Sequence, residues 1–442
     1  MAYVTGEARE QVTMFPLTLD ELIPADHVCR VIEAFVNRLA MQELGFVRAE
    51  PAETGRPGYD PRDLLKLYLY GYMNQLRSSR RMEAECQRNV EVMWLLGRLR
   101  PDYKSIAEFR RMHREAVKEA GAELVRLARE VGLVRGEWAA IDGSKFRAVS
   151  SAARVKEREA VARYLEEMEA ADAQDEVVID PGAVQAALEK LKNDPEPEAR
   201  FMRTTEGKRP AYNVQTAVDA ACGIIVAQEV TTEANDTRSL LPMAEAAKQA
   251  VGDPESLHVV ADTGYSNGEQ AAGCEAQGIE PHVPANRGVN HSGDGTLFDR
   301  SEFHYEEASD TMTCPAGQRL HRQAVQKERR QVVYVGETGV CGACPLRACC
   351  TTAARRTVKR HIFEEALRRM QQRATAEAMR LRRCVVERVF AELKYRSFGH
   401  PRFLLRGRSG AQTEISLASM AYNLKRMIAV LGGVGLQAIL VD

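Results

Sequence analysis

The sequence of 442 residues lacks the features that identify several classes of protein. It has no apolar run of about 18 residues, so no segment is suited to span a membrane. Its first residues do not join a basic start to an apolar stretch, so we expect no secretory signal and a cytoplasmic protein. It has no internal repeat and no long disordered tail. A chain of this length exceeds one compact core, so two or three domains are expected.

No overall excess of either charge is present, because 61 Lys and Arg face 62 Asp and Glu. The charges are nevertheless unevenly distributed. Residues 351–410 hold 16 basic and 5 acidic side chains, whereas residues 151–200 hold 7 basic and 13 acidic ones. A basic block suits a nucleic acid, since neutralised phosphates supply most non-specific affinity. A solvated arginine-rich helical surface explains the block equally well.

The ten cysteines do not indicate a disulfide framework, because the cytoplasm keeps thiols reduced. Five of them are concentrated in one segment: Cys314, Cys341, Cys344, Cys349 and Cys350. Four thiolates around a tetrahedral Zn²⁺ would form a closed structural site. Reduced, unliganded cysteine is the alternative. A redox role is disfavoured, because no thioredoxin-like strand and helix surround the CxxC.

The first 135 residues or so are predicted to be helical. Asp60 and Pro61 have the residue types of a helix start, and Ser105 with Glu108 has the spacing of a capping box. A basic turn, Arg77-Ser-Ser-Arg-Arg81, lies between these helices. The arrangement is typical of a helix-turn-helix DNA-binding module. A plain helical bundle has nearly the same pattern.

Two short apolar segments, residues 138–141 and 257–261, are predicted strands that end at Asp142 and Asp262. Carboxylates at strand ends are close to a buried sheet yet open to solvent, and they suit Mg²⁺. A single Asp after a strand is more often a turn or cap residue. Spacing alone does not show that the two meet.

Residues 212–218 and 224–230 are predicted to form an antiparallel hairpin, followed by a helix over residues 240–251. The next helix is expected to be capped by Asn267. This order of strands and helices predicts a mixed sheet flanked by helices, which is an α/β fold.

A helix is predicted around Glu387. At about 100° per residue, Val386, Phe390 and Leu393 form a buried stripe. Arg383, Glu387 and Lys394 fall within a similar arc beside it. The Glu387 carboxylate is thus expected between two cations, beside the face by which this helix packs on the rest of the protein.

Three ordered blocks of this sequence resemble the acidic blocks of DDE-type insertion-sequence transposases. They are Ile141-Asp-Gly-Ser-Lys145, Ala261-Asp-Thr-Gly-Tyr265, and Arg383-x3-Glu387-x6-Lys394. Further similarities lie in residues 59–66, 78–81 and 212–219, and in Asn235, Asp236, Gly407 and Asn423. Arg380 departs from the family pattern, which has a tyrosine there. The resemblance covers nearly the whole chain, in the bacterial branch with an N-terminal helical domain and a Cys-rich insertion before the catalytic Glu.

The resemblance implies an RNase H-like catalytic domain over residues 136–430, after a helical DNA-end-binding domain over residues 1–135. A charged helical insertion over residues 152–205 and a Cys-rich insertion over residues 285–360 are expected to interrupt it. Residues 431–442 would form a C-terminal tail.

By the same resemblance, Asp142, Asp262 and Glu387 are the catalytic residues and bind Mg²⁺ or Mn²⁺. Arg383 and Lys394 are expected to contact DNA phosphates, and Arg80 and Arg81 to contact DNA from the N-terminal domain. Asn235 and Asp236 are expected to support the site. The structural Zn²⁺ ligands are expected to be Cys314, Cys341, Cys344 and Cys350, with Cys349 as the alternative fourth ligand.

The expected activity is cleavage at the element's terminal inverted repeats and joining of the 3′-hydroxyl ends to target DNA by two-metal-ion phosphoryl transfer. The expected partners are element-end DNA and target DNA, with a homodimer or a higher synaptic assembly associated with the bacterial nucleoid. Two alternatives stay open. One is a metal-dependent nuclease with the same core, and the other is a non-catalytic DNA-binding protein with the same fold.

Overall fold

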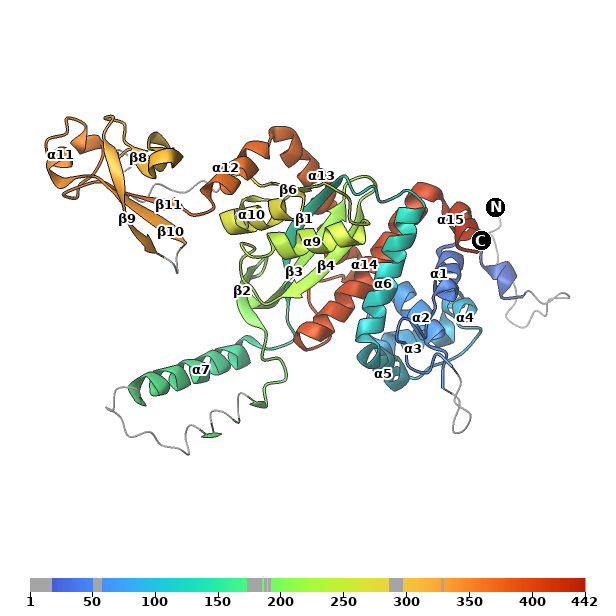
Figure 1. The fold of residues 1–442 in the computed structure, drawn as a ribbon. Coiled ribbons are helices and arrows are strands. Elements are labelled where there is room, and N and C mark those ends of the chain that lie inside the picture. The colour runs from blue at the N-terminus through green and yellow to red at the C-terminus, as the bar shows by residue number, and fades with distance from the viewer. Residues whose placement is uncertain are drawn as a thin grey trace, which may run out of the picture. The chain divides into compact units, whose positions relative to one another are not determined.

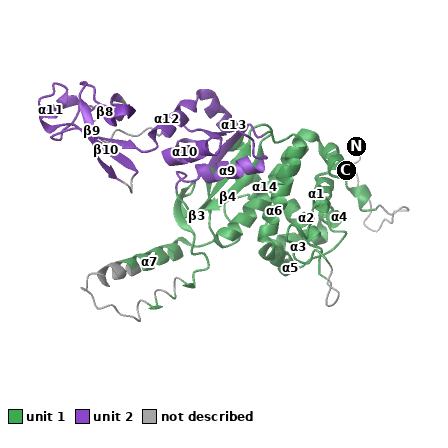
Figure 2. Cartoon of the chain, viewed as in Figure 1, with its two compact units in different colours: residues 1–135, 143–234, 385–442 green, residues 136–142, 235–384 purple. Residues whose placement is uncertain are grey.

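The computed structural model describes residues 18–50, 58–172, 185–186, 189, 192–285, 297–326 and 330–441. The chain divides into two compact units, drawn in different colours in Figure 2. Unit 1 combines Met1–Arg135, Gly143–Ala234 and Val385–Asp442, and unit 2 combines Gly136–Asp142 and Asn235–Cys384.

The N-terminal part of unit 1 is helical, as predicted (Figure 1). Asp60 caps α2 by accepting a hydrogen bond from the Arg62 amide at 2.8 Å, and Pro61 occupies the first turn. The helices before the first strand are η1 (Asp20–Leu22), α1 (Val28–Arg38), α2 (Pro61–Met73), α3 (Ser79–Arg88), α4 (Val90–Leu95), α5 (Tyr103–Met112) and α6 (Arg114–Glu130).

The predicted start of α5 is wrong by one turn. The helix begins at Tyr103, and its cap is Asp102, which accepts hydrogen bonds from the backbone amides of Lys104 and Ser105 at 2.8 and 3.1 Å. Asp and Ser are about equally strong N-caps. Here the Asp102 carboxylate satisfies backbone amides of the first turn, which would have no partner if the helix began after Ser105.

The predicted hairpin is confirmed in unit 1. β3 (Gly207–Asp219) pairs antiparallel with β4 (Ile224–Thr231), and Asn213 lies opposite Thr231. Gly223 ends the turn with φ of 72°, which glycine adopts without steric cost. β2 (Arg200–Thr204) pairs with the other end of β3, and α7 (Ala152–Asp172) precedes it.

The long helix α14 (Gly407–Leu431) contacts β4, α6 and α2 within unit 1 (Figure 1). Its Asn423 side chain accepts a hydrogen bond from the Ile225 amide at 2.9 Å and donates one to the Ile225 carbonyl at 2.8 Å. Gln412 accepts another from the Val230 amide at 2.8 Å. Side chains of α14 thus satisfy backbone groups of β4, which pairs with β3 in the described sheet. α15 (Gly433–Val441) follows α14.

Unit 2 contains parallel strands. Residues 138–140 of β1 (Trp138–Arg147) pair with β5 (Leu257–Val260), and β5 pairs with β6 (Ile279–His282). The strand order is β2-β3-β1-β5-β6, with β4 on β3. This mixed sheet with its helices confirms the predicted α/β class. The accompanying helices of unit 2 are α9 (Leu240–Ala250), η2 (Thr263–Tyr265), α10 (Gly268–Ala276) and α12 (Glu364–Arg373), followed by α13 (Ala376–Ala391).

The Cys-rich segment of unit 2 has a five-stranded antiparallel sheet of its own, in the order β11-β10-β9-β8-β7. A small core of buried side chains holds it: Phe303, Met312, Leu320, Val332, Tyr334 and Val358. Its elements are η3 (Arg300–Glu302), β7 (His304–Glu306), η4 (Glu307–Ser309), β8 (Thr311–Thr313), β9 (Arg319–Gln326), β10 (Gln331–Val335), α11 (Thr338–Gly342), η5 (Arg347–Cys349) and β11 (Thr357–His361).

Among the described residues, none of the helices is by itself long and apolar enough to cross a membrane. α14 and α15 meet the length and composition criteria only as a pair, and a bend of 108° separates them.

Candidate active site and metal centres

Asp142 lies in the middle of β1, so the prediction that a strand ends there is wrong. The strand continues to Arg147, since β1 is hydrogen-bonded to β3 as well as to β5, and backbone groups far along the chain bond to its last residue. The Arg147 amide donates to the Pro401 carbonyl at 2.8 Å, and the Phe403 amide donates to the Arg147 carbonyl at 2.9 Å. Asp-Gly is usually a turn signal, and here these tertiary hydrogen bonds outweigh it.

Asp262 follows β5, as predicted. Its carboxylate caps η2 by accepting a hydrogen bond from the Gly264 amide at 2.8 Å. β1 and β5 are parallel, and Ala140 lies opposite Val260. Asp142 and Asp262 each come two residues after this pair. The register therefore places them at the same height along the strand direction, on adjacent segments.

One arginine connects the two aspartates. Nη2 of Arg382, on α13, lies 3.0 Å from Oδ2 of Asp142 and 3.6 Å from Oδ2 of Asp262. The side chains of Arg382 and Asp142 are only 14% and 17% exposed, whereas that of Asp262 is 45% exposed. The two carboxylates therefore face one positively charged group at a partly buried position.

Tyr265 and Asp236 belong to the same cluster. Tyr265 is fully buried, and burial raises the pKa of its phenol well above the ordinary value. Three carboxylates raise that pKa further and Arg382 lowers it; the carboxylates are Asp236, Asp142 and Asp262. A Cβ atom added to Gly264 would lie 2.9 Å from Oδ1 of Asp262 and 3.7 Å from Oδ2 of Asp236. A side chain at position 264 would therefore press on the Asp262 carboxylate, whereas the distance to Asp236 is an ordinary van der Waals contact.

Glu387 lies on α13, so the predicted helix is confirmed around it. Val386 and Phe390 are buried and Glu387 is exposed, as the predicted stripe requires. Glu387 belongs to unit 1, whereas both aspartates belong to unit 2. Its convergence with them stays a prediction.

The α-helix ends before Lys394. A π-helix, η6 (Glu392–Ser397), follows α13 directly, and Leu393 is buried within it. Lys394 therefore lies in a π-helix and not in the regular α-helix on which its predicted arc was based, and its place beside Glu387 stays a prediction. The Lys394 ammonium lies 5.9 Å from the Phe146 ring centroid. Arg383 is exposed on α13.

In the N-terminal helices, Arg80 and Arg81 are exposed in the first turn of α3. The Arg80 guanidinium lies 5.1 Å from the Tyr103 ring centroid. Arg77 of the same basic segment is buried and pairs with Glu414 at 2.9 Å, so it is a structural residue. The segment thus separates into one core arginine and two that face solvent.

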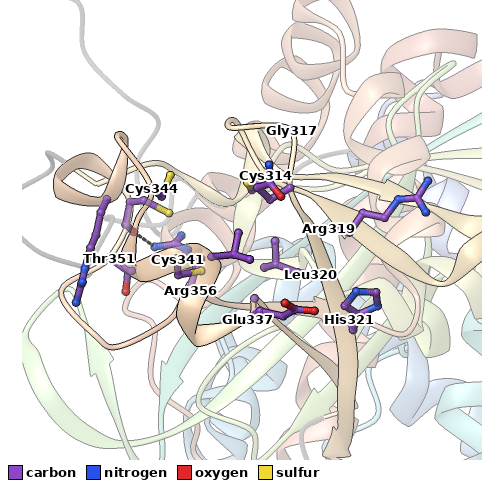
Figure 3. Close-up of a pocket in the computed structure, with 15 residues that line it drawn as sticks. Cys314, Gly317, Arg319, Leu320, His321, Glu337, Cys341, Cys344, Thr351 and Arg356 are labelled. Carbon is purple, nitrogen blue, oxygen red and sulfur yellow. Dashed lines mark hydrogen bonds between the residues drawn. The ribbon is translucent and has the colours of Figure 1, made fainter.

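Four of the five clustered cysteines line one cavity of the small sheet: Cys314, Cys341, Cys344 and Cys350. Figure 3 draws the lining side chains of this cavity and labels Cys314, Cys341 and Cys344. Burial raises the pKa of the Cys350 thiol; Arg356 lowers it, and the three other thiols raise it. Cys349 is exposed. The four cysteines that line this cavity are the same four that were expected from the sequence as zinc ligands.

The thiols are not in contact as metal ligands would be. Among the described residues, the cysteines are not one of the groups of three or more His, Cys, Asp or Glu whose ligand atoms lie within 4.8 Å of one another. The backbone is close to the cluster, since a Cβ atom on Gly336 would lie 2.7 Å from Sγ of Cys341.

Two family models match the chain. A transposase domain model (DUF772) matches residues 17–112, and the transposase DDE domain matches residues 141–424. The first covers the N-terminal helices, and the second begins one residue before Asp142 and includes Asp262 and Glu387. Comparison with curated proteins and with solved structures gave no match.

Proposed function

Because the chain belongs to the insertion-sequence DDE transposases, with an N-terminal domain before the catalytic domain, we propose that it moves its own element. It binds the terminal inverted repeats, cleaves DNA at the element ends and joins the 3′-hydroxyl ends to target DNA. The observation that carries this proposal is the level pair of aspartates, Asp142 and Asp262, both facing the Arg382 guanidinium.

The residues fit divalent metal ions. Oxygen donors suit Mg²⁺ and Mn²⁺, and two carboxylates already accommodate one cationic group between them. We assign Asp142, Asp262 and Glu387 as the metal ligands. When bound, two such ions activate a water or 3′-hydroxyl nucleophile and stabilise the leaving oxygen.

The chain's own residues orient the site. The Gly264 amide holds Oδ1 of Asp262 at 2.8 Å and fixes the direction of that carboxylate. The buried phenol of Tyr265 lies near these carboxylates, and its raised pKa keeps it neutral, so it adds no negative charge to the cluster. Arg382 supplies the positive charge, and Asp236 supports the cluster.

We assign DNA contacts to four basic residues: Arg80, Arg81, Arg383 and Lys394. The three arginines are exposed. Arginine forms bidentate contacts with phosphate, and it positions a protein on the duplex without reading sequence. The N-terminal helices would read the terminal repeats. Coordinated cleavage of two ends requires a homodimer or a higher synaptic assembly, in the cytoplasm and on the nucleoid.

We also propose a structural Zn²⁺ on Cys314, Cys341, Cys344 and Cys350. The support is that these four thiols line one cavity in a small sheet with a core of few side chains. Small modules of this kind gain folding free energy from a metal. Binding requires side-chain rotations that bring the sulfurs together.

The test is cleavage and joining of a DNA substrate with the element's own ends, with Mg²⁺ present. Wild type, Glu387→Gln and Asp142→Asn are compared with Glu377→Gln, an exposed glutamate on the same helix. We expect end nicks and strand-transfer products for wild type and Glu377→Gln, and neither product for the other two. Nicks without joining would support a nuclease. End binding without cleavage in any protein would support a non-catalytic DNA-binding protein.

A further inference from the structure

A second cluster of metal-ligating side chains lies in unit 2, on the strands that lead to Asp262. His258 of β5 lies opposite Glu280 of β6, and His282 lies two residues further along β6. Alternation along a strand places all three side chains on one face of the sheet. Their ligand atoms all lie within 4.8 Å of one another.

The distances match those between ligands of one ion. Nδ1 of His258 lies 3.2 Å from Nε2 of His282 and 3.7 Å from Oε2 of Glu280. Zn–N bonds of about 2.0–2.1 Å in a tetrahedral site separate two ligand nitrogens by about 3.3 Å. The two imidazoles are thus spaced as partners of a single transition metal.

Neighbouring groups orient each ligand. Nδ1 of His282 lies 2.8 Å from the Arg373 carbonyl, which can only accept, so Nδ1 carries the proton and Nε2 presents its lone pair to the cluster. The Ser256 hydroxyl donates to Oε1 of Glu280 at 3.1 Å and leaves Oε2 for the cluster. Such outer partners accompany most metal-binding histidines.

Aromatic stacking fixes the third ligand. The Trp138 ring stacks on His258 with centroids 4.5 Å apart and an interplanar angle of 19°. Arg373 is the nearby cation, with its guanidinium Nε 4.0 Å from Oε2 of Glu280. Another nitrogen of that group lies 2.8 Å from Glu275, which shares its charge. Because Arg373 lies closer to Glu275, the Glu280 carboxylate can accept a further cation.

We propose that His258, Glu280 and His282 bind one Zn²⁺-class ion, with solvent completing the coordination. Two imidazoles and one carboxylate suit zinc and its late first-row neighbours rather than Mg²⁺. The ion would link β5 to β6, the last strand in the sheet order, because its ligands come from both strands. His258 precedes Asp262 by four residues, about 13 Å along an extended chain, and His282 lies opposite Val260, so the three ligands come before the catalytic carboxylates along these strands and share no residue with them. It does not depend on the proposed function.

A hydrogen bond between the two histidines without metal is the competing explanation, and zinc binding by the full-length chain distinguishes the two. Cys341→Ser serves as the background, because it weakens binding at the cysteine cluster. Zinc stoichiometry and affinity are measured by titration calorimetry. Ligand type is measured by X-ray absorption, in which Zn–S bonds of about 2.3 Å differ from Zn–N bonds of about 2.0–2.1 Å.

We expect one zinc with nitrogen and oxygen ligands in the background protein. Adding His258→Ala should lower its affinity more than about tenfold, since even outer partners of metal ligands contribute factors of about 10 to 100. His304→Ala, at an exposed histidine of the same unit, should leave it unchanged. Glu280→Gln keeps a hydrogen-bonding oxygen and repeats the test with less risk to folding. Equal affinity in the background and Glu280→Gln proteins, or sulfur as the only ligand, would overturn the proposal.

Discussion

Nη2 of Arg382 lies 3.0 Å from Oδ2 of Asp142, and the same nitrogen lies 3.6 Å from Oδ2 of Asp262. A guanidinium and a divalent cation would compete for these carboxylate oxygens. Arg382 therefore influences how tightly the aspartates bind metal.

The Arg382→Ala variant should bind Mn²⁺ about fivefold more tightly than wild type, because a competing ion pair of about 1 kcal/mol is removed. Calorimetric titration of the full chain measures this. Arg383→Ala is the matched control, since that arginine is the exposed neighbour on the same helix. Weaker Mn²⁺ binding by Arg382→Ala would mean that the arginine organises the carboxylates instead of competing for them.

The cysteine cluster should bind zinc more tightly as pH rises. The thiols must lose their protons to bind, and burial raises the pKa of Cys350, so protons compete with the metal near neutral pH. Cys350→Ser should weaken sulfur-ligated zinc more than tenfold, on the order of what ligand-supporting groups contribute. Cys349→Ser should not, because that side chain is exposed. A larger effect of Cys349→Ser would assign it as the fourth ligand.

Removing both exposed arginines of α3 should lower the salt dependence of end binding. Each lost phosphate contact reduces the slope of log K against log salt by about 0.9, so Arg80→Ala with Arg81→Ala should reduce it by about 2. Arg111→Ala is the control, because its guanidinium Nε is held by Glu108 at 2.8 Å. An unchanged slope in the double variant would remove both arginines from the DNA interface.

Replacement of Glu414 should strongly destabilise unit 1. It is fully buried, pairs with Arg77 at 2.9 Å and accepts hydrogen bonds from the Leu404 and Leu405 amides, each at 2.7 Å. Glu414→Ala leaves a buried guanidinium without its partner and should lower the free energy of unfolding by about 3–5 kcal/mol.

Urea denaturation measures the Glu414→Ala effect. Glu229→Ala, at a side chain 49% exposed, should change the free energy of unfolding by no more than about 0.5 kcal/mol. Similar losses for the two variants would show that the buried pair contributes little.

Alkaline pH should destabilise unit 1 partly through Tyr68. Burial raises the pKa of its phenol to about 12 from an ordinary 10.0, so above pH 10 the unfolded chain releases a proton that the folded chain keeps. This contribution to stability is fully present below pH 10 and is lost by about pH 12. Tyr68→Phe should therefore flatten the decline in that range, measured by urea denaturation at stepped pH. Tyr395→Phe, at an exposed position, should keep the wild-type slope.

Local sequence signals predicted much of the fold. Asp60 with Pro61 indicated the start of α2, and the turn before Gly223 indicated the hairpin, because both depend on residues a few positions apart. The position of Asp262 followed from a short apolar run and its end. The prediction that Ser105 caps this helix was wrong because Asp102, an equally good cap three residues earlier, accepts hydrogen bonds from the amides of the first turn.

Features set by distant contacts were not predictable. β1 continues past Asp142 with β3 as a second partner in the sheet, and backbone groups near residue 402 bond to Arg147, more than 250 residues away. Arg382 and Arg383 are adjacent, and the rotation of α13 in the folded chain decides which one faces the aspartates. The π-helix that carries Lys394 has no simple local signal either.

The hydrogen bonds from Asn423 and Gln412 to β4 have a further consequence. A strand at the end of a sheet exposes backbone groups that can recruit a strand from another molecule and start aggregation. Here the amides of Ile225 and Val230 are already occupied by side chains of the same chain. Copies of this protein gathered at high local concentration are therefore kept from joining through β4, and any ordered assembly must use other surfaces.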